Sequence, residues 1–132
     1  MSRVGYSHAA RHKIFSELVA AVLESHYVPA AILPRKTYSR LADAMADDAA
    51  LHPDLAVSGL WVEVTSTPSM ARIGEYIDAG QRDAQIAGSA DPVAVVSYRR
   101  GRSGADGIAS MSLDDLAELL ARMSASESPV GQ

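Results

Sequence analysis

Two carboxylates lie in the segment HPDLAVSGLWVEVTST, residues 52–67. Asp54 and Glu63 are nine positions apart, and Ser58-Gly59 lies midway between them as a plausible two-residue turn of a β-hairpin. Counting outward from this turn places Asp54 directly opposite Glu63, with Cβ atoms roughly 4.5–5.5 Å apart. Two like charges so placed destabilise a sheet, and burial raises the pKa of at least one of them.

A divalent cation between the two carboxylates reverses this repulsion. Mg²⁺ is commonly held by one or two carboxylates, while water and substrate phosphate fill its other positions. Strand alternation also places Trp61, Glu63 and Thr65 on one face of the hairpin and its apolar residues on the other. The pair therefore indicates a metal site that faces a cleft. The alternative is two exposed acids on an edge hairpin, and a register shifted by one residue also separates them.

Hydrophobic periodicity predicts four helices around this hairpin. The first covers residues 7–26, and a second, weaker one covers residues 37–50. The third begins at Thr67 as N-cap and ends at Gly88. The fourth follows the capping residue Ser112, and four of its apolar side chains are expected to face inward: Leu113, Leu116, Leu120 and Met123.

Three further segments predict strands. Two prolines limit the first to a short edge strand within residues 27–34, residues 92–98 are apolar as in a strand covered on both faces, and residues 108–111 form the last. This order of elements predicts an α/β fold with a central mixed β-sheet flanked by helices, in one domain of residues 1–123. The small, polar residues 124–132 predict a disordered tail.

The composition excludes several classes of protein. The chain of 132 residues has no cysteine, so it has neither a disulfide framework nor a thiolate metal site. No apolar run reaches membrane-spanning length and no signal-peptide pattern opens the sequence, so we expect a cytoplasmic protein without membrane partners. The formal net charge is −4, so any nucleic-acid surface must be a local basic patch.

The segment PDLAVSGLWVEVT resembles the signature of the PD-(D/E)XK nuclease superfamily, in which an aspartate ends one strand and Glu-x-Lys lies on the next. Apart from residues 27–51, the chain resembles the phage-type Holliday junction resolvases of this superfamily in order and spacing. The other stretches that carry the resemblance are FSELVAAVLES, IGEYIDAGQRDAQIAG, PVAVVSYRRGRSG and SMSLDDLAELLARM. It implies a restriction-endonuclease-like nuclease that cleaves branched or duplex DNA as a homodimer, in a bacterial or phage-infected cell.

The resemblance also implies a role for each matching position. Asp54 and Glu63 are the expected ligands of Mg²⁺ or Mn²⁺, helped by the backbone carbonyl of Val64. An outer acid on the first helix is expected at Glu17 or Glu24, which are seven residues apart and share a helix face.

One position departs from the motif, because Thr65 stands where the superfamily has a lysine. In these nucleases the lysine orients the attacking water and offsets charge on the phosphate, and its loss costs on the order of 10²–10³ in rate by analogy with a deleted oxyanion donor. Lys13 or Lys36 is a candidate replacement from another element. The alternative function is a catalytically inactive nuclease-fold protein that serves as a phage structural or protein-interaction module.

Basic and polar side chains near the predicted strand ends are candidates for DNA contacts. Arg99, Arg100 and Arg102 lie in a glycine-rich loop, where they either grip phosphates or form a solvated loop tip. Lys36 belongs to a second basic cluster with the same two interpretations. Gln81 resembles a glutamine that some resolvases place on the helix after the hairpin.

Other polar residues have structural interpretations. His8 and His12 are one helical turn apart but lack a third metal ligand of matching spacing, so we expect them at the surface. Trp61 is expected to pack under a neighbouring helix or at a dimer contact. Asp114 and Asp115 occupy the first turn of the last helix, where the helix dipole accounts for them.

Overall fold

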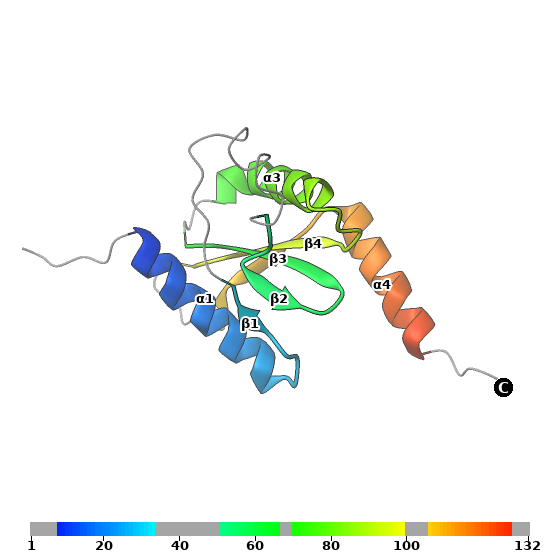
Figure 1. The fold of residues 1–132 in the computed structure, drawn as a ribbon, viewed down its shortest axis with the longest axis horizontal. Helices are drawn as coiled ribbons and strands as arrows, with labels where there is room; N and C mark the ends of the chain where they lie inside the picture. Colours follow the sequence, from blue (N-terminus) through cyan, green and yellow to red (C-terminus); the bar gives the residue numbers. More distant parts are fainter. Residues whose placement is uncertain (1–7, 34–50, 67–69, 100–105, 128–132) are drawn as a thin grey trace, which may run out of the picture.

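The computed structural model describes residues 8–33, 51–66, 70–99 and 106–127 of the chain (Figure 1). In chain order its elements are α1 (His8–Ser25), β1 (Ala31–Ile32), β2 (Leu55–Val57), β3 (Leu60–Thr65), the 3₁₀ turn η2 (Met70–Arg72), α3 (Ile73–Ile86), β4 (Val93–Ser97), β5 (Ile108–Ser110) and α4 (Leu113–Glu127). The predicted helix over residues 37–50 lies outside the described residues.

The strands form one mixed sheet in the order β1-β2-β3-β4-β5. The first three strands form an antiparallel meander, β3 and β4 are parallel, and β5 is antiparallel to β4. A parallel pair needs a crossover connection, which α3 supplies across one face of the sheet, while α1 lies on the opposite face (Figure 1). The predicted α/β fold with a central mixed sheet flanked by helices is confirmed.

The hairpin of β2 and β3 has the predicted turn and register. Gly59 adopts a φ of 80°, a left-handed conformation that glycine reaches without a steric penalty. The strand residues pair as counted from this turn: Val57 with Leu60, Ala56 with Trp61, and Leu55 with Val62. The alternation of side chains is therefore set along the whole of β3.

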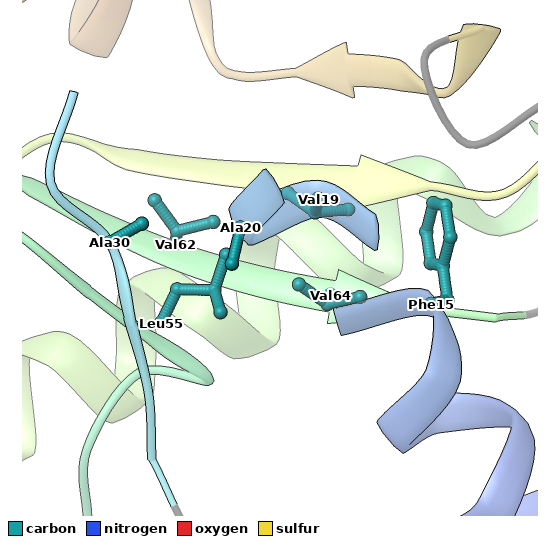
Figure 2. Close-up of a cluster of buried hydrophobic side chains, with 7 residues drawn as sticks. All are labelled: Phe15, Val19, Ala20, Ala30, Leu55, Val62 and Val64. Atoms are coloured by element: carbon teal, nitrogen blue, oxygen red, sulfur yellow. The ribbon is translucent and has the colours of Figure 1, made fainter. Parts of the chain in front are cut away.

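The main core lies between α1 and the sheet (Figure 2). The helix buries side chains at three- and four-residue steps, and these meet apolar residues of β2 and β3. In the middle of α1, the ring of Phe15 packs edge-on against Tyr98, with ring centroids 5.5 Å apart. The buried cluster consists of Phe15, Val19, Ala20, Ala30, Leu55, Val62 and Val64.

A second, smaller cluster fills the space between α3 and the other face of the sheet, where Trp61, Ala84 and Val93 are buried together. The backbone of α3 approaches the sheet closely at Gly80. A Cβ atom at this position would lie 2.9 Å from Cγ1 of Val93 and 3.3 Å from Cγ of Glu63. Glycine at position 80 therefore lets the helix lie directly over Glu63.

The start of α3 differs from the prediction, and its end agrees with it. The helix begins at Ile73 after η2, and its N-cap residue Arg72 makes no side-chain capping hydrogen bond. The predicted N-cap, Thr67, lies outside the described residues. At the C-terminal end, Gly88 has a φ of 79° and Ser89 N–H donates to the carbonyl of Ala84, as in a glycine-terminated helix.

The prediction that four apolar residues of α4 face inward is wrong. The exposed fractions of Leu113, Leu116, Leu120 and Met123 are 80%, 38%, 52% and 50%. Both faces of the sheet are covered by α1 and α3, and α4 projects beyond the edge of this two-sided core (Figure 1). Amphipathic periodicity shows that a helix has an apolar face but not what that face contacts.

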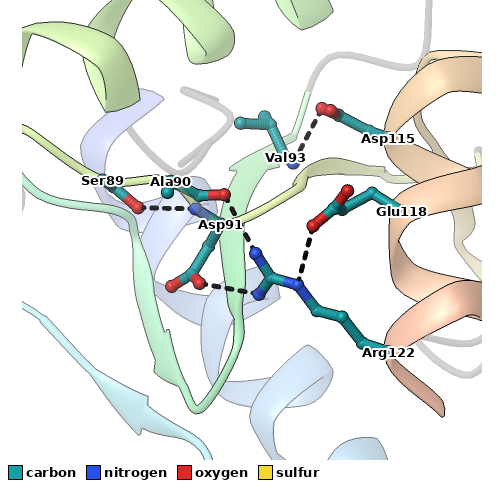
Figure 3. Close-up of polar contacts among 7 residues, drawn as sticks. All are labelled: Ser89, Ala90, Asp91, Val93, Asp115, Glu118 and Arg122. Atoms are coloured by element: carbon teal, nitrogen blue, oxygen red, sulfur yellow. Dashed lines mark hydrogen bonds and ion pairs between the residues drawn. The ribbon is translucent and has the colours of Figure 1, made fainter. Parts of the chain in front are cut away.

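Polar contacts attach α4 to the turn before β4 (Figure 3). The guanidinium of Arg122 donates to the carboxylate of Asp91 and to the carbonyl of Ala90, at 3.1 Å each. Asp115 accepts from the backbone N–H of Val93 at 3.0 Å, so it does more than balance the helix dipole. The predicted cap is present, since Ser112 Oγ accepts from the backbone N–H of Asp115.

The last helix continues past the expected start of the tail at Ser124 and ends at Glu127. None of the helices in the described part of the chain is both long and apolar enough to cross a membrane.

Candidate active site

Asp54 lies in a bend directly before β2 and makes two hydrogen bonds with the backbone of β3. Its backbone N–H donates to the carbonyl of Val62 at 2.9 Å, and its Oδ2 accepts from the backbone N–H of Val64 at 2.7 Å. Pro53 precedes it and has no N–H to extend the ladder. The side chain of Asp54 therefore accepts the Val64 N–H that a longer β2 would have bound, and it lies beside Glu63.

Glu63 is held in place from three directions. Its backbone is paired with Val95 in the middle of the parallel β3–β4 ladder, and its side chain lies under Gly80 of α3. The indole N–H of Trp61, two residues earlier on the same face, donates to its Oε1 at 2.8 Å. Trp61 itself is buried under α3, as one of the two predicted placements had it.

The surroundings of the two carboxyl groups, and the interaction between them, move their pKa values in opposite directions. Burial raises the pKa of Glu63 to about 8, and the negative charge of Asp54 adds to this rise. Burial also acts to raise the pKa of Asp54, but hydrogen bonds from His12 and from the N–H of Val64 outweigh it and hold that pKa below its usual value. At neutral pH the pair consists of an ionised Asp54 and a protonated Glu63.

His12 of α1 also belongs to this site, contrary to the expectation that it lies at the surface. Its side chain is 12% exposed, and its Nε2 lies 3.4 Å from Oδ2 of Asp54. The signal in the sequence was its position on the core-facing stripe of α1, since it precedes Phe15 and Ser16 by three and four residues. A histidine on a buried stripe needs a polar partner, and Asp54 is that partner.

The donor atoms at this edge suit a divalent cation of the Mg²⁺ type. Because the N–H and C=O of one strand residue point to the same side, the carbonyl of Val64 faces the edge at which its N–H binds Asp54. Two carboxylates and one carbonyl match the oxygen preference of Mg²⁺ or Mn²⁺, with water and phosphate as the other ligands. Within the described residues, no three or more His, Cys, Asp or Glu side chains form a complete metal site by themselves.

The other predicted site residues are more widely distributed. Glu17 and Glu24 are exposed on α1, and Glu24 lines a hollow beside β1 together with Tyr27 and Ala56. Thr65 is half-buried at the end of β3, on the same face as Glu63, and pairs with Ser97.

Gln81 lies in the contact between helices, where its side-chain amide donates to Ser112 and to Asp115 of α4 at 3.1 Å. Arg99 is exposed just after β4. Arg100, Arg102 and Lys36 lie outside the described residues.

Fold and site together define an α/β protein in which the edge of a hairpin carries two carboxyl groups that retain one proton at neutral pH. Comparisons of the chain with protein-family models, with curated proteins and with solved structures found no match.

Proposed function

We propose that this protein is a metal-dependent endodeoxyribonuclease of the PD-(D/E)XK type, similar to Holliday junction resolvases. It hydrolyses phosphodiester bonds of branched or duplex DNA with Mg²⁺ or Mn²⁺, as a cytoplasmic homodimer. The observation that carries the proposal is the pairing of Asp54 and Glu63, two buried carboxyl groups that retain one proton without a cation and would provide two ligands with one. Asp54 lies at the end of β2 that adjoins Glu63 of β3, so the two acids lie on neighbouring strands as in the superfamily signature.

Each residue of the site has a separate task in this proposal. Asp54 and Glu63 hold the cation, and the indole of Trp61 fixes the orientation of the Glu63 carboxylate. When bound, the cation supplies an activated water and a clamp on the scissile phosphate. The hydroxyl of Thr65 hydrogen-bonds the attacking water, and Arg99 contacts the DNA backbone from the end of β4.

Incubation of the purified chain with four-way-junction and duplex DNA tests this activity, in Mn²⁺ and in Mg²⁺. We expect nicking by the wild type and none by Asp54→Ala or Glu63→Gln. Glutamine keeps the shape and hydrogen bonds of a protonated glutamate but cannot become an anionic ligand, so the second variant separates metal binding from folding. No cleavage by the wild type at high protein concentration in either metal would reject the nuclease.

Thr65 favours a second candidate function, in which the same fold binds DNA or a protein without cleaving DNA. The net charge of −4 and the absence of the motif lysine support this alternative. Binding of a junction or a partner would then survive the loss of both acids. The substitution Thr65→Lys distinguishes the candidates, because gain of cleavage on the order of 10²-fold would show a metal site that lacks only a cationic side chain.

A further inference from the structure

We propose that His12 is a positioning residue of this metal site. Its imidazole and the backbone N–H of Val64 together hold Oδ2 of Asp54, and this leaves Oδ1 as the oxygen that binds the cation. The proposal rests on the proposed function, because it assigns a residue to the same site. The superfamily resemblance placed an acid on the first helix, whereas here a histidine of that helix contacts the pair.

One oxygen of Asp54 has a hydrogen bond from β3 and a longer polar contact with α1. The N–H of Val64 lies 2.7 Å from Oδ2, and Nε2 of His12 lies 3.4 Å from the same atom. A short hydrogen bond and a neighbouring imidazole on the same oxygen restrict the rotation of the carboxylate, so its other oxygen is fixed in direction. Since ligating carboxylates in metal sites are themselves hydrogen-bonded, this arrangement matches an outer shell that orients a ligand.

The packing of α1 explains how the imidazole reaches this position. The buried stripe of the helix passes through His12, Phe15, Ser16 and Val19, at three- and four-residue steps. The edge contact between Phe15 and Tyr98 holds the helix against the sheet about one turn after His12. Packing of this stripe against the sheet therefore places His12 beside Asp54. The two side chains are similarly buried, with exposed fractions of 12% and 16%.

The test measures Mn²⁺ binding to the full chain without DNA, from the electron paramagnetic resonance signal of free Mn²⁺ at one fixed pH. The emission of Trp61, the one tryptophan of the chain, provides a second readout because its indole donates to Glu63. We expect His12→Ala to weaken Mn²⁺ affinity about 10–100-fold, as for other outer-shell partners. His12→Gln should keep an affinity close to that of the wild type, because its amide N–H lies where Nε2 does.

Ser16→Ala is the matched control, because Ser16 lies on the same buried stripe one turn later and its hydroxyl has no hydrogen-bond partner among the described residues. We expect it to bind Mn²⁺ like the wild type. All affinities are measured below the thermal unfolding transition of each variant, so that loss of folded protein is not counted as loss of binding.

The outcomes separate this inference from the function on which it rests. If the wild type binds Mn²⁺ and His12→Ala binds it equally well, the positioning role is overturned and the proposed metal site stands. If His12→Gln loses as much affinity as His12→Ala, the loss comes from packing and the role is also overturned. If the wild type binds no Mn²⁺, both the metal site and the role of His12 are overturned.

Discussion

At the scale of single residues, the site is a compromise between burial and charge. Glu63 is placed under a helix and beside an ionised aspartate, and both conditions favour its neutral form. Asp54 remains ionised because an imidazole and a backbone N–H bind its carboxylate. A protonated Glu63 stabilises the metal-free fold, whereas an ionised Glu63 is the better metal ligand. The proton and the cation therefore compete for the same carboxyl group.

Replacing Glu63 by glutamine should change how stability depends on pH. The pKa of Glu63 is about 8 in the folded protein and near the ordinary glutamate value of 4.5 in the unfolded chain, so its stabilising contribution is complete below pH 4.5. That contribution is lost as the pH rises from about 4.5 to 8, because only the unfolded chain releases the proton freely. We therefore expect Glu63→Gln to match the wild type near pH 4.5 and to exceed it by up to a few kcal/mol at pH 8.

Urea unfolding at several pH values between 4.5 and 8 measures this difference. Glu75→Gln is the control, because Glu75 is an exposed glutamate on α3 whose ion pair with Arg72 lies at the surface. Its stability should stay close to that of the wild type across the range. A constant offset between Glu63→Gln and the wild type would contradict a buried, protonated Glu63.

Asp54 has the opposite dependence, because its pKa is lowered in the folded protein. Its contribution is present above pH 3.8 and is lost as the pH falls further. The two residues together place the greatest stability of the metal-free protein on the acidic side of neutrality.

At the scale of elements, the approach of α3 to the sheet determines whether Glu63 is sheltered. Gly80 lets the helix backbone lie against Val93 and the stem of Glu63, so the helix contributes to the burial that raises the pKa of Glu63. A crossover helix is needed wherever two neighbouring strands are parallel. The site therefore forms at the one parallel pairing of the described sheet.

Two glycines of α3 should respond in opposite ways to substitution by alanine. Alanine usually stabilises a helix relative to glycine by roughly 0.5–1 kcal/mol. At Gly80 the new Cβ meets Val93 at 2.9 Å, and we expect overpacking to reverse the sign and cost about 1–3 kcal/mol. At Gly74 a Cβ meets nothing within 4 Å, so we expect a small gain. Thermal unfolding of both variants measures the contrast, and equal effects would place α3 farther from the sheet.

At the scale of the whole molecule, the core is concentrated between α1 and the sheet, while α4 is attached at the margin. The ties of α4 to the domain run through Asp115, Arg122 and Gln81, whereas its leucine face is exposed. The stability of the monomer should depend on the α1 layer far more than on the apolar residues of α4.

Two leucine-to-alanine substitutions measure this difference directly. Leu55 is fully buried in the α1 core, and its truncation should lower the free energy of unfolding by about 2–5 kcal/mol. Leu120 is 52% exposed, and its truncation should cost less than about 1 kcal/mol. Denaturant unfolding at low protein concentration provides both values. A cost at Leu120 similar to that at Leu55 would mean that α4 is buried in the protein in solution.

Much of the fold could be read from local patterns. Alternation and the Ser58-Gly59 turn determined the register of the hairpin, because the side-chain period of a strand allows only one pairing that keeps the apolar face inward. The extents of α1 and β4 also followed from periodicity and from the length of an apolar run. These features depend on neighbours in the chain, and the sequence contains those neighbours.

The composition of the site and the place of α4 were decided only by tertiary structure. The sequence places His12 on the core-facing stripe of α1, but its contact with Asp54 depends on where that helix crosses the sheet. The exposure of Leu120 likewise depends on which faces other elements had already covered. Periodicity describes one element, whereas a contact involves two. The pairing of Asp54 with Glu63 could therefore be predicted from the hairpin, but the contact of His12 with Asp54 could not.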